Sequence, residues 1–487
     1  MRDDQIRTRL VEMNPWWGAA AASRDRLEWV AHDQVLRTRK SFDLGYRPAL
    51  LDDVAHGPVD DKLVVVRGPR RVGKSVLLKD VAATLCARDD VDPRQIVYLP
   101  TDGMKEQDLN RAEIIGRDLT RSIGAAPRVW LFDEITSIAG WTKALKYRRD
   151  NTVFGNDTVV CTGSSWAADT AAVADLIAGR SGVSSISRLR ILFPMSFREF
   201  VKATQRRITL PSAVWPWELQ SAAVAEASEI AELEASDLDL AWQAYLESGG
   251  FPRAVHEFHT RGTVSTAFLA DLGAWLHQDV DPDSAADSIA LLLDELARNS
   301  TSPLNRSALA ERLGYAGHQT LDTRLNRLTN SFGALWCHQI DDKGRRVAGS
   351  QSKLYLADPL LAHLPSRLRA GLARPDFTVL AEGALAVVLA RAVEKSEPGR
   401  WLAQDTIGYL RTGSGNEVDF GPVSTRSAAG THMTTPVESK WVAAGWRGEA
   451  RVIEGKFGRG VVATRNIGDV TNPAWALPAP LVALLLG

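Results

Sequence analysis

The chain has 487 residues, of which 45% are hydrophobic, so it is too long for one ordinary domain and can bury several cores. Its 58 basic and 59 acidic side chains nearly cancel, which excludes attraction of a polyanion by the overall charge. Three cysteines, far apart, fit neither a disulfide framework nor a zinc site. The N-terminal residues lack a signal-peptide pattern, and the apolar run Leu481–Leu486 is too short to span a bilayer. We therefore expect a cytoplasmic protein without a membrane segment.

Residues 1–45 predict a helical segment. Asn14-Pro15 has the form of a helix start, with proline in the first turn. The two tryptophans that follow, Trp16 and Trp17, are interpreted as packing anchors rather than as a ligand site.

From residue 60 onward, short apolar runs alternate with stretches of helical spacing. Continuous apolar runs separated by helices are typical of a parallel sheet that helices cover on both faces. The sequence therefore predicts an α/β core over residues 46–200. The runs expected to form its strands are 63–66, 96–99, 129–132, 158–161 and 189–193.

A P-loop motif, G-x-x-x-x-G-K-[ST], follows the first of these runs and precedes a helical stretch. Its glycines permit a tight loop whose backbone N–H groups wrap phosphates, and the helix N-terminus adds positive potential. We expect Lys74 to reach the β- and γ-phosphates and the Ser75 hydroxyl to bind Mg²⁺. The residues expected to bind the nucleotide here are Gly68, Pro69, Arg70, Arg71, Val72, Gly73, Lys74, Ser75 and Val76.

Two acids, Asp133 and Glu134, follow the apolar run 129–132. A strand that ends in acids places carboxylates at the carboxyl edge of the sheet, beside the P-loop. We expect Asp133 to hold Mg²⁺ through water and Glu134 to orient or activate the attacking water. The next run ends in small hydroxyl residues, of which Thr162 or Ser164 would sense the γ-phosphate; the alternative is simple turn chemistry.

Arg180 is a candidate arginine finger, which would offer its charge to the phosphate of a neighbouring subunit in a homo-oligomer. Arg188 and Arg190 compete for that role, and a surface salt bridge is an equal alternative for each. The predicted catalytic residues are thus Lys74, Glu134 and Arg180. Neither a guanine-selecting Asn-Lys-x-Asp nor a transporter-type Leu-Ser-Gly-Gly-Gln occurs, so ATP is the expected nucleotide.

The remainder of the chain divides into three predicted regions. Residues 201–260 are helical and polar, and are expected to form a lid that ends at the break 248–252. Residues 261–372 contain a helix–turn–helix followed by a strand pair, which suggests a winged-helix module. Residues 373–487 begin with a helix at 381–393. Strands are then expected at 416–420, 436–441 and 460–464.

Basic residues give the winged-helix candidate a possible DNA contact, mainly with phosphates. The alternative is a protein-docking module with a solvated basic face. The residues concerned are Arg324 and Arg327 on one helix, and Lys343, Arg345 and Arg346 on the wing.

Taken in order, the motifs of the chain resemble a known group, the prokaryotic AAA-type ATPases with a C-terminal domain of the type called DUF4143. The resemblance spans most of the chain, and the ordered set is specific, although no single later motif is. The motifs that carry it are Gly68–Ser75, Phe132–Ile135 with Trp141, Thr162–Ser165, Gly179-Arg180, Phe193–Phe197 with Glu199-Phe200, Gly249–Pro252, Lys353–Tyr355 with Asp358, and Glu417–Phe420.

Acids in the last region resemble the PD-(D/E)xK nuclease pattern. Glu438 and Lys440 share one face of a strand, since residues i and i+2 point the same way, and would converge with Asp419. Glu382 on the preceding helix would complete the cluster. Carboxylates that bind Mg²⁺ beside a lysine are what phosphodiester hydrolysis needs. The alternative is a salt-bridged strand pair in a fold that does not cut.

The resemblance implies an AAA-like core, a helical lid, a winged-helix region and a terminal restriction-endonuclease-like fold, with ATP and Mg²⁺ as cofactors. Thr136, where many relatives have glutamine, is a departure that puts the surroundings of the attacking water in doubt. The leading hypothesis is an ATPase that couples hydrolysis to a C-terminal effector acting on DNA. The alternatives are an ATP-gated DNA nuclease and a switch that binds ATP to recruit a protein, with little turnover.

Overall fold

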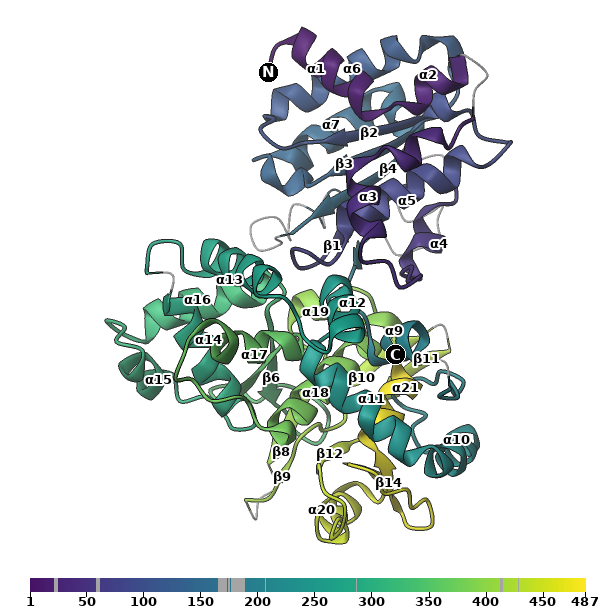
Figure 1. Ribbon diagram of the computed structural model, residues 1–487. Helices are drawn as coiled ribbons and strands as arrows, with labels where there is room; N and C mark the ends of the chain where they lie inside the picture. Colours follow the sequence, from purple (N-terminus) through teal and green to yellow (C-terminus); the bar gives the residue numbers. More distant parts are fainter. Residues whose placement is uncertain are drawn as a thin grey trace. The chain divides into compact units, whose positions relative to one another are not determined.

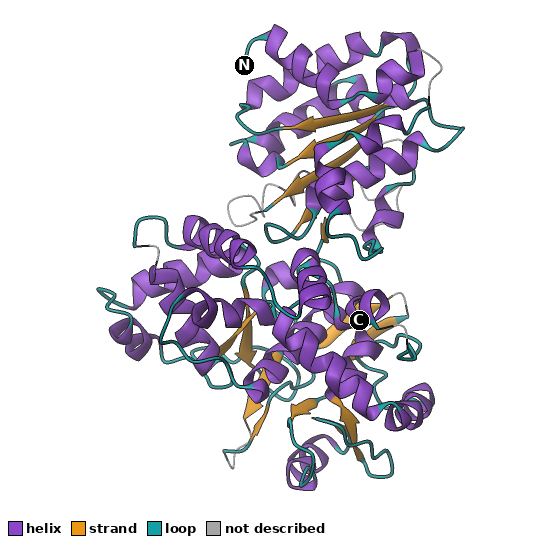
Figure 2. Ribbon diagram, in the orientation of Figure 1, coloured by secondary structure: helices purple, strands orange, loops and turns teal. Residues whose placement is uncertain are grey.

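The computed structural model describes residues 1–21, 25–57, 62–164, 173, 176, 189–205, 207–285, 287–411, 415–427 and 429–487. The chain forms two compact units, Met1–Phe193 and Pro194–Gly487, which appear in Figure 1 in sequence colours and in Figure 2 by secondary structure. Each unit has its own sheets and its own hydrophobic core.

A five-stranded parallel sheet lies at the centre of the first unit. Its strands follow the order β2-β3-β4-β1-β5, and every neighbouring pair is parallel, so all the carboxyl ends meet at one edge. The predicted parallel sheet is confirmed. The strands are β1 (Leu63–Arg67), β2 (Ile96–Pro100), β3 (Val129–Asp133), β4 (Thr158–Gly163) and β5 (Leu189–Ile191).

Helices cover both faces of this sheet, which is why its strands are apolar without alternation. In β1, Leu63 and Val65 pack against one face while Val64 and Val66 pack against the other. The first face is covered by α1 (Asp3–Met13), α6 (Glu106–Leu119) and α7 (Trp141–Asn151). The second is covered by α2 (Trp16–Ala21), α3 (Gln34–Lys40), α4 (Leu50–Val54) and α5 (Lys74–Cys86).

The N-terminal segment is fastened to the edge strand β2. The indole N–H groups of Trp16 and Trp17 both donate to the backbone oxygen of Ile96, at 3.0 and 2.8 Å. The Asn14 side chain accepts from the N–H of Tyr98 at 2.6 Å and donates to its carbonyl oxygen at 2.8 Å. The two tryptophans are therefore packing anchors, as predicted.

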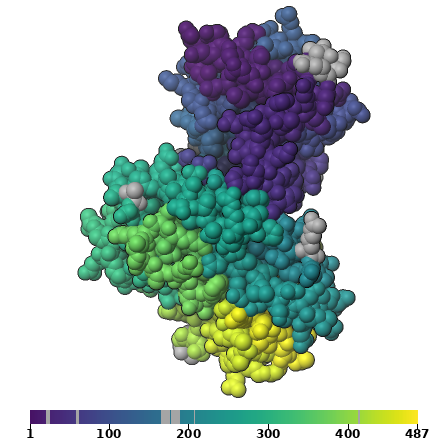
Figure 3. Space-filling view, in the orientation of Figure 1, coloured from purple at the N-terminus to yellow at the C-terminus, as the bar shows by residue number. Residues whose placement is uncertain are grey.

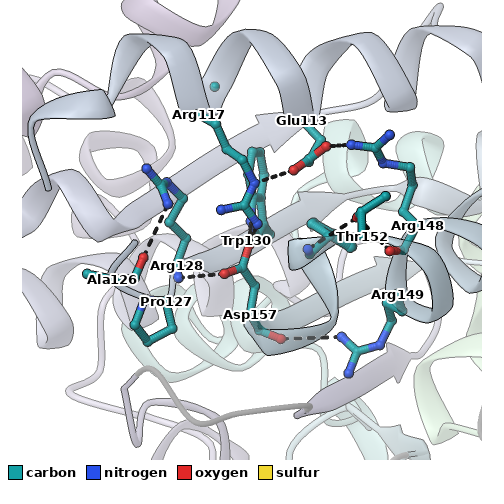
Figure 4. Close-up of polar contacts among 12 residues, drawn as sticks. Glu113, Arg117, Ala126, Pro127, Arg128, Trp130, Arg148, Arg149, Thr152 and Asp157 are labelled. Atoms are coloured by element: carbon teal, nitrogen blue, oxygen red, sulfur yellow. Dashed lines mark hydrogen bonds and ion pairs between the residues drawn. The ribbon is translucent and has the colours of Figure 1, made fainter. Parts of the chain in front are cut away.

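A buried ion-pair network lies where β3 and β4 begin, at the opposite edge of the sheet from their carboxyl ends (Figure 4). Asp157, directly before β4, accepts from the backbone N–H of Arg128 at 2.9 Å and pairs with Arg117. Glu113 on α6 pairs with Arg117 and with Arg148 of α7. Both acids are buried, and these partners offset part of the cost of desolvation; at Asp157 burial still outweighs them and raises the pKa.

The second unit begins with helices. The helices of residues 201–260, which were expected to form a lid, pack against the C-terminal part of the chain. Arg465 pairs with Asp239 at 2.7 Å. In Figure 3 the yellow C-terminal residues lie beside the teal ones. The helices are α9 (Phe197–Thr204), α10 (Ala222–Leu233), α11 (Ala235–Ser248), α12 (Pro252–Arg261), α13 (Thr266–Val280), α14 (Asp287–Asn299), α15 (Arg306–Arg312), α16 (His318–Asn330), α17 (Pro359–Leu368), α18 (Phe377–Ser396), α19 (Arg400–Ala403), α20 (Arg447–Phe457) and α21 (Ala479–Leu486).

The predicted helix–turn–helix is present as α15 and α16, and the antiparallel pair β6–β7 follows it. β6 also pairs with β8, and β8 with β9, so one sheet has the order β7-β6-β8-β9. The boundary proposed at residue 372 lies between strands of this sheet. The strands are β6 (Ala334–Gln339), β7 (Ser352–Leu356), β8 (Gly408–Arg411) and β9 (Glu417–Val418).

Two smaller sheets complete the unit. The strands β12 (Val437–Ser439), β13 (Gly460–Thr464) and β14 (Ala474–Pro478) are parallel, and β10 (Ser424–Ser427) and β11 (Gly430–Met433) form a hairpin that was not predicted. Asp419 lies directly after β9 rather than within a strand. The helix α21 is buried along its whole length, so the apolar run at 481–486 closes the core of the last region, as expected.

Three segments that carry the sequence resemblance meet in the second unit. The backbone N–H of Gly250 donates to Oδ2 of Asp358 at 2.8 Å, and its carbonyl oxygen accepts from the N–H of Met195 at 2.7 Å. Gly249 has a φ of +64°, and a Cβ there would come within 1.9 Å of Oδ1 of Asp358. Only glycine permits this close approach.

The cysteines Cys86, Cys161 and Cys337 are free and buried. Burial raises the pKa of the Cys86 and Cys161 thiols to about 12, so both stay protonated at neutral pH. Within the described ranges, every helix is too short or too polar to cross a bilayer.

Candidate nucleotide-binding site

The strand order brings the P-loop and the predicted acids together. β4 lies between β1 and β3, so Thr162, near its end, lies between the loop after β1 and the acids at the end of β3. Open parallel sheets bind ligands at this carboxyl edge. Residues separated by almost 100 positions in the chain thus form one site.

The loop between β1 and α5 depends on unusual backbone angles. Gly68 has a φ of +154° and Gly73 of +104°, which glycine adopts without strain. A Cβ at Gly68 would come within 2.2 Å of the backbone oxygen of Leu192. Arg71 has a φ of +66°, which is uncommon for a residue with a side chain.

The Lys74 side chain is folded into this loop. Its ammonium donates to the carbonyl oxygens of Gly68 and Pro69, at 2.9 Å each, and is buried. Among the described residues, no side chain caps the N-terminus of α5, which begins at Lys74. The first amides of α5, its dipole and the ammonium therefore fit a polyanion. In the same segment Arg70 and Arg71 are exposed, Val72 is buried, and Ser75 and Val76 are half-buried in the first turn of α5.

Asp133 is buried at the end of β3, and both of its carboxylate oxygens are held. The Thr162 hydroxyl donates to Oδ1 at 2.7 Å, and the Tyr98 hydroxyl donates to Oδ2 at 2.9 Å. Each carboxylate oxygen accepts two hydrogen bonds, so each has a second lone pair suited to a water bound to Mg²⁺. Burial, together with the charge of Asp133, raises the pKa of Tyr98, which keeps its hydroxyl a donor.

Negative charge gathers at this edge of the sheet. Burial and the charges of Glu134 and Asp133 raise the pKa of Asp102, which follows β2. A magnesium ion would relieve this repulsion, so the arrangement fits the predicted cofactor.

Glu134 adopts a left-handed conformation, with a φ of +55°. Its N–H donates to the Thr162 hydroxyl at 2.9 Å. Its carboxylate Oε1 accepts from the N–H of Ser164 at 2.9 Å and from the Ser164 hydroxyl, with the Thr136 hydroxyl 3.3 Å away. Burial acts to raise the pKa of Glu134, but the Lys74 ammonium and the Ser164 hydrogen bonds outweigh it, and the pKa lies below its usual value. The group is therefore an ionised, oriented carboxylate at neutral pH.

The candidate γ-phosphate sensors lie in the site, whereas of the three candidate arginine fingers only Arg190 lies within the described residues. Thr162 and Ser164 lie within one network with the two acids, and their role as sensors of the γ-phosphate stays a prediction. Arg180 and Arg188 lie outside the described residues. Arg190 lies on β5 and pairs with Asp53.

Tyr98 belongs to the site but was not anticipated from the sequence. It lies on β2, next to β3 in the sheet, so its hydroxyl reaches Asp133 on the neighbouring strand. Its only signal is a polar ring within an otherwise aliphatic run, Ile96–Leu99.

In the second unit the predicted acids converge, but they do so around a lysine. The ammonium of Lys353 on β7 lies 2.7 Å from Glu417, 2.9 Å from Asp419 and 3.4 Å from Glu382. The Tyr355 hydroxyl donates to the same oxygen of Glu382 at 2.6 Å. We call these five residues the Lys353 cluster.

The other two predicted ligands lie beside this cluster. Oε2 of Glu438 accepts from the backbone N–H of Asp419 at 3.1 Å, and the Lys440 ammonium lies 3.6 Å from both Glu438 and Glu449. Among the described residues, no three carboxylates, imidazoles or thiolates are arranged to hold a metal ion. The predicted set Glu382, Asp419, Glu438 and Lys440 is thus divided: the Lys353 ammonium contacts one oxygen each of Glu382 and Asp419, and Glu438 lies beside Lys440.

Two of the arginines predicted to contact DNA are engaged in ion pairs. Arg324 pairs with Asp281 at 2.7 Å, and Arg345 pairs with Asp341 at 2.7 Å. The guanidinium of Arg327 lies 3.4 Å from the backbone oxygen of Val280, and Lys343 and Arg346 are exposed.

Two family profiles match the chain. Residues 60–201 match a family described as an AAA domain. Residues 239–370 match a family described as a domain of unknown function, DUF8612, and the DUF4143 type implied by the sequence motifs stays a prediction. No curated protein matches.

Several solved structures resemble parts of the chain at low identity. A Walker-type ATPase of Pyrococcus abyssi is 15% identical, covering 62% of this chain and 90% of that one with a TM-score of 0.37. The Aeropyrum pernix ORC2 protein, in ADPNP–ADP complexes, is 13% identical, covering 72% and 98% with a TM-score of 0.32. Thermotoga maritima RuvB is 17% identical, covering 56% and 81% with a TM-score of 0.24.

The profile match covers the whole P-loop, both acids and all five strands of the parallel sheet. Residues 60–201 are therefore similar to the AAA domain family over the whole of the P-loop site and its sheet.

Proposed function

We propose that the first unit binds ATP with Mg²⁺ at the P-loop and hydrolyses it. The observation that carries this proposal is the single hydrogen-bonded network of Asp133, Glu134, Thr162 and Ser164 at the sheet edge beside Lys74. Magnesium, when bound, would neutralise phosphate charge and polarise the terminal phosphoryl group. Ser75 and Asp133 are the residues that would hold it.

Each residue then has a distinct role. Lys74 exchanges its two loop carbonyl partners for phosphate oxygens, which are better acceptors for an ammonium. Glu134 orients the attacking water and accepts its proton, because its ionised carboxylate is already fixed by Ser164. Thr162 links Glu134 to Asp133, so the two acids are positioned as a pair.

The second unit is proposed as the effector of this nucleotide cycle. A DNA-binding role would use the exposed Lys343 and Arg346; it would not use Arg324, which pairs with the buried Asp281, and the alternative is docking of a protein partner. The second candidate function is therefore a nucleotide-dependent switch that recruits a protein. The arginine finger, the homo-oligomer and the cytoplasmic location stay predictions.

The test is ATP turnover by purified wild type and Glu134→Gln, with and without DNA. Glu134→Gln keeps the oxygen that accepts from Ser164, so ATP affinity should be unchanged while kcat falls about 100-fold or more. Glu12→Gln, at an exposed position of α1, is the control and should match wild type. Equal turnover in wild type and Glu134→Gln would remove the assigned role; stimulation by DNA would favour the DNA-acting effector over the protein switch.

A further inference from the structure

The Lys353 ammonium has all of its donors directed at carboxylates. An ammonium group has three N–H donors, and three carboxylate oxygens, on Glu417, Asp419 and Glu382, lie 2.7, 2.9 and 3.4 Å away. The partners come from β9, from the residue after it, and from α18. The lysine therefore sits at the point on which these acids converge.

The sheet holds this lysine in place. Lys353 lies opposite Cys337 in the β6–β7 pair, and its side chain has no exposed surface. Residues i and i+2 of a strand share a face, so Tyr355 is presented to the cluster beside it and binds Glu382. The ammonium also lies 5.7 Å from the centre of the Tyr409 ring, within the range of a cation–π contact.

A divalent cation bound at Oε1 of Glu417, Oδ1 of Asp419 and Oε1 of Glu382 would compete with the ammonium for these three oxygens. Magnesium needs oxygen ligands at about 2.1 Å in octahedral geometry, and one shared carboxylate would bring it close to the ammonium. Two cations at that distance inside a protein repel strongly, and an expelled ammonium would lose three charged partners. The lysine at the position expected from the nuclease pattern, Lys440, pairs instead with Glu438 and Glu449.

We propose that Lys353 is the permanent cation of this cluster, in the place where a metal ion would lie in a nuclease of this pattern. The cluster then acts as a clamp rather than as a hydrolytic site. It joins residues on either side of position 370, because Lys353 belongs to the matched region 239–370 and its three acidic partners follow that region. The second unit thus acts on its partner by binding, without metal-dependent cleavage at these acids.

The direct test is a Mn²⁺ titration of the nucleotide-free full-length protein, followed by electron paramagnetic resonance of free Mn²⁺. Wild type and Asp419→Asn should bind the same number of Mn²⁺ ions, since neither has a metal site in the cluster. A Mn²⁺ ion that binds wild type and is lost in Asp419→Asn would overturn the proposal, as would Mn²⁺-dependent cleavage of DNA that Asp419→Asn abolishes. The titration contains no nucleotide, so its outcome does not depend on ATPase activity.

A second variant tests whether the ammonium excludes the metal. Lys353→Met removes the charge while keeping much of the side-chain volume, so it should gain one Mn²⁺ site per chain and a melting temperature that rises with Mn²⁺. The control Lys343→Met, at an exposed position, should gain neither. A folded Lys353→Met protein that gains no Mn²⁺ site would contradict the proposal. If Lys353→Met does not fold, the Mn²⁺ titration of wild type and Asp419→Asn still tests the proposal.

Discussion

The hydroxyl of Tyr98 donates a hydrogen bond of 2.9 Å to Oδ2 of Asp133 and thereby links two neighbouring strands at the proposed magnesium site. The face of the same ring lies 3.8 Å from the ammonium of Lys79 on the P-loop helix α5. Lys79 in turn pairs with Asp33, directly before α3, at 3.0 Å. The N-terminal segment, the P-loop helix and the magnesium-binding acid are therefore connected through one tyrosine.

We expect Tyr98→Phe to lower ATP turnover roughly tenfold, because a hydrogen bond to a charged group contributes about 1.5–3 kcal/mol. The Mg²⁺ concentration that gives half-maximal activity should rise as Asp133 loses its orientation. The measurement is steady-state turnover as a function of Mg²⁺. Tyr147→Phe, where the tyrosine is 62% exposed, is the matched control. An unchanged Mg²⁺ dependence in Tyr98→Phe would assign the tyrosine a packing role only.

Removing one partner from the buried network around Asp157 should destabilise the first unit (Figure 4). Asp157→Asn places an amide nitrogen either at Oδ2, facing the donors of Trp130 and Arg117, or at Oδ1, facing the N–H of Arg128, so we expect a loss of about 2–4 kcal/mol in the free energy of unfolding. Urea unfolding of wild type and variant measures this loss in the free energy of unfolding. Asp118→Asn breaks the exposed pair with Arg7 and should cost far less, because solvent screens that pair. Equal effects of the two variants would contradict the importance of burial here.

The second unit should lose stability in mild acid, partly through His338. Burial, followed by the charges of Arg346 and Arg306, lowers the pKa of His338 to about 4, from an unfolded value of 6.5. Between these values the unfolded chain binds a proton that the folded chain does not. The free energy of unfolding therefore falls as the pH drops below 6.5, and this loss is complete below about pH 4.

Denaturant unfolding between pH 7 and pH 5 isolates this histidine when wild type is compared with His338→Gln. The variant should lose less stability over that interval than wild type, and His318→Gln, at an exposed position, should behave like wild type. The same pH slope in all three proteins would exclude His338 as a source of acid sensitivity.

Much of the nucleotide site could be predicted because its residues lie at the ends of strands or shortly after them in the sequence. The runs around Val64 and Leu131 are apolar since both faces of their strands are buried, and the residues that follow them must emerge at one edge. The sequence thus placed Lys74, Asp133 and Glu134 correctly relative to strands without knowledge of the strand order.

Site residues that come from a neighbouring strand could not be predicted in the same way. Tyr98 reaches Asp133 because β2 is the neighbour of β3, and Lys353 reaches Asp419 because β6 joins β7 to β8 and β9. Such pairings depend on tertiary packing rather than on local spacing. Glu382 and Asp419 converge as predicted, but the lysine that joins them comes from a strand 29 residues before Glu382 and 66 residues before Asp419.

The measurement that tests the account most directly is the affinity of the purified chain for ATP with Mg²⁺, determined by calorimetry for wild type, Lys74→Ala and the exposed control Lys143→Ala. The account predicts one ATP per chain for wild type and the control, and an affinity lower by about 10- to 100-fold in Lys74→Ala, from the loss of a charged hydrogen bond to phosphate. No binding by wild type, or equal affinity in wild type and Lys74→Ala, would contradict it.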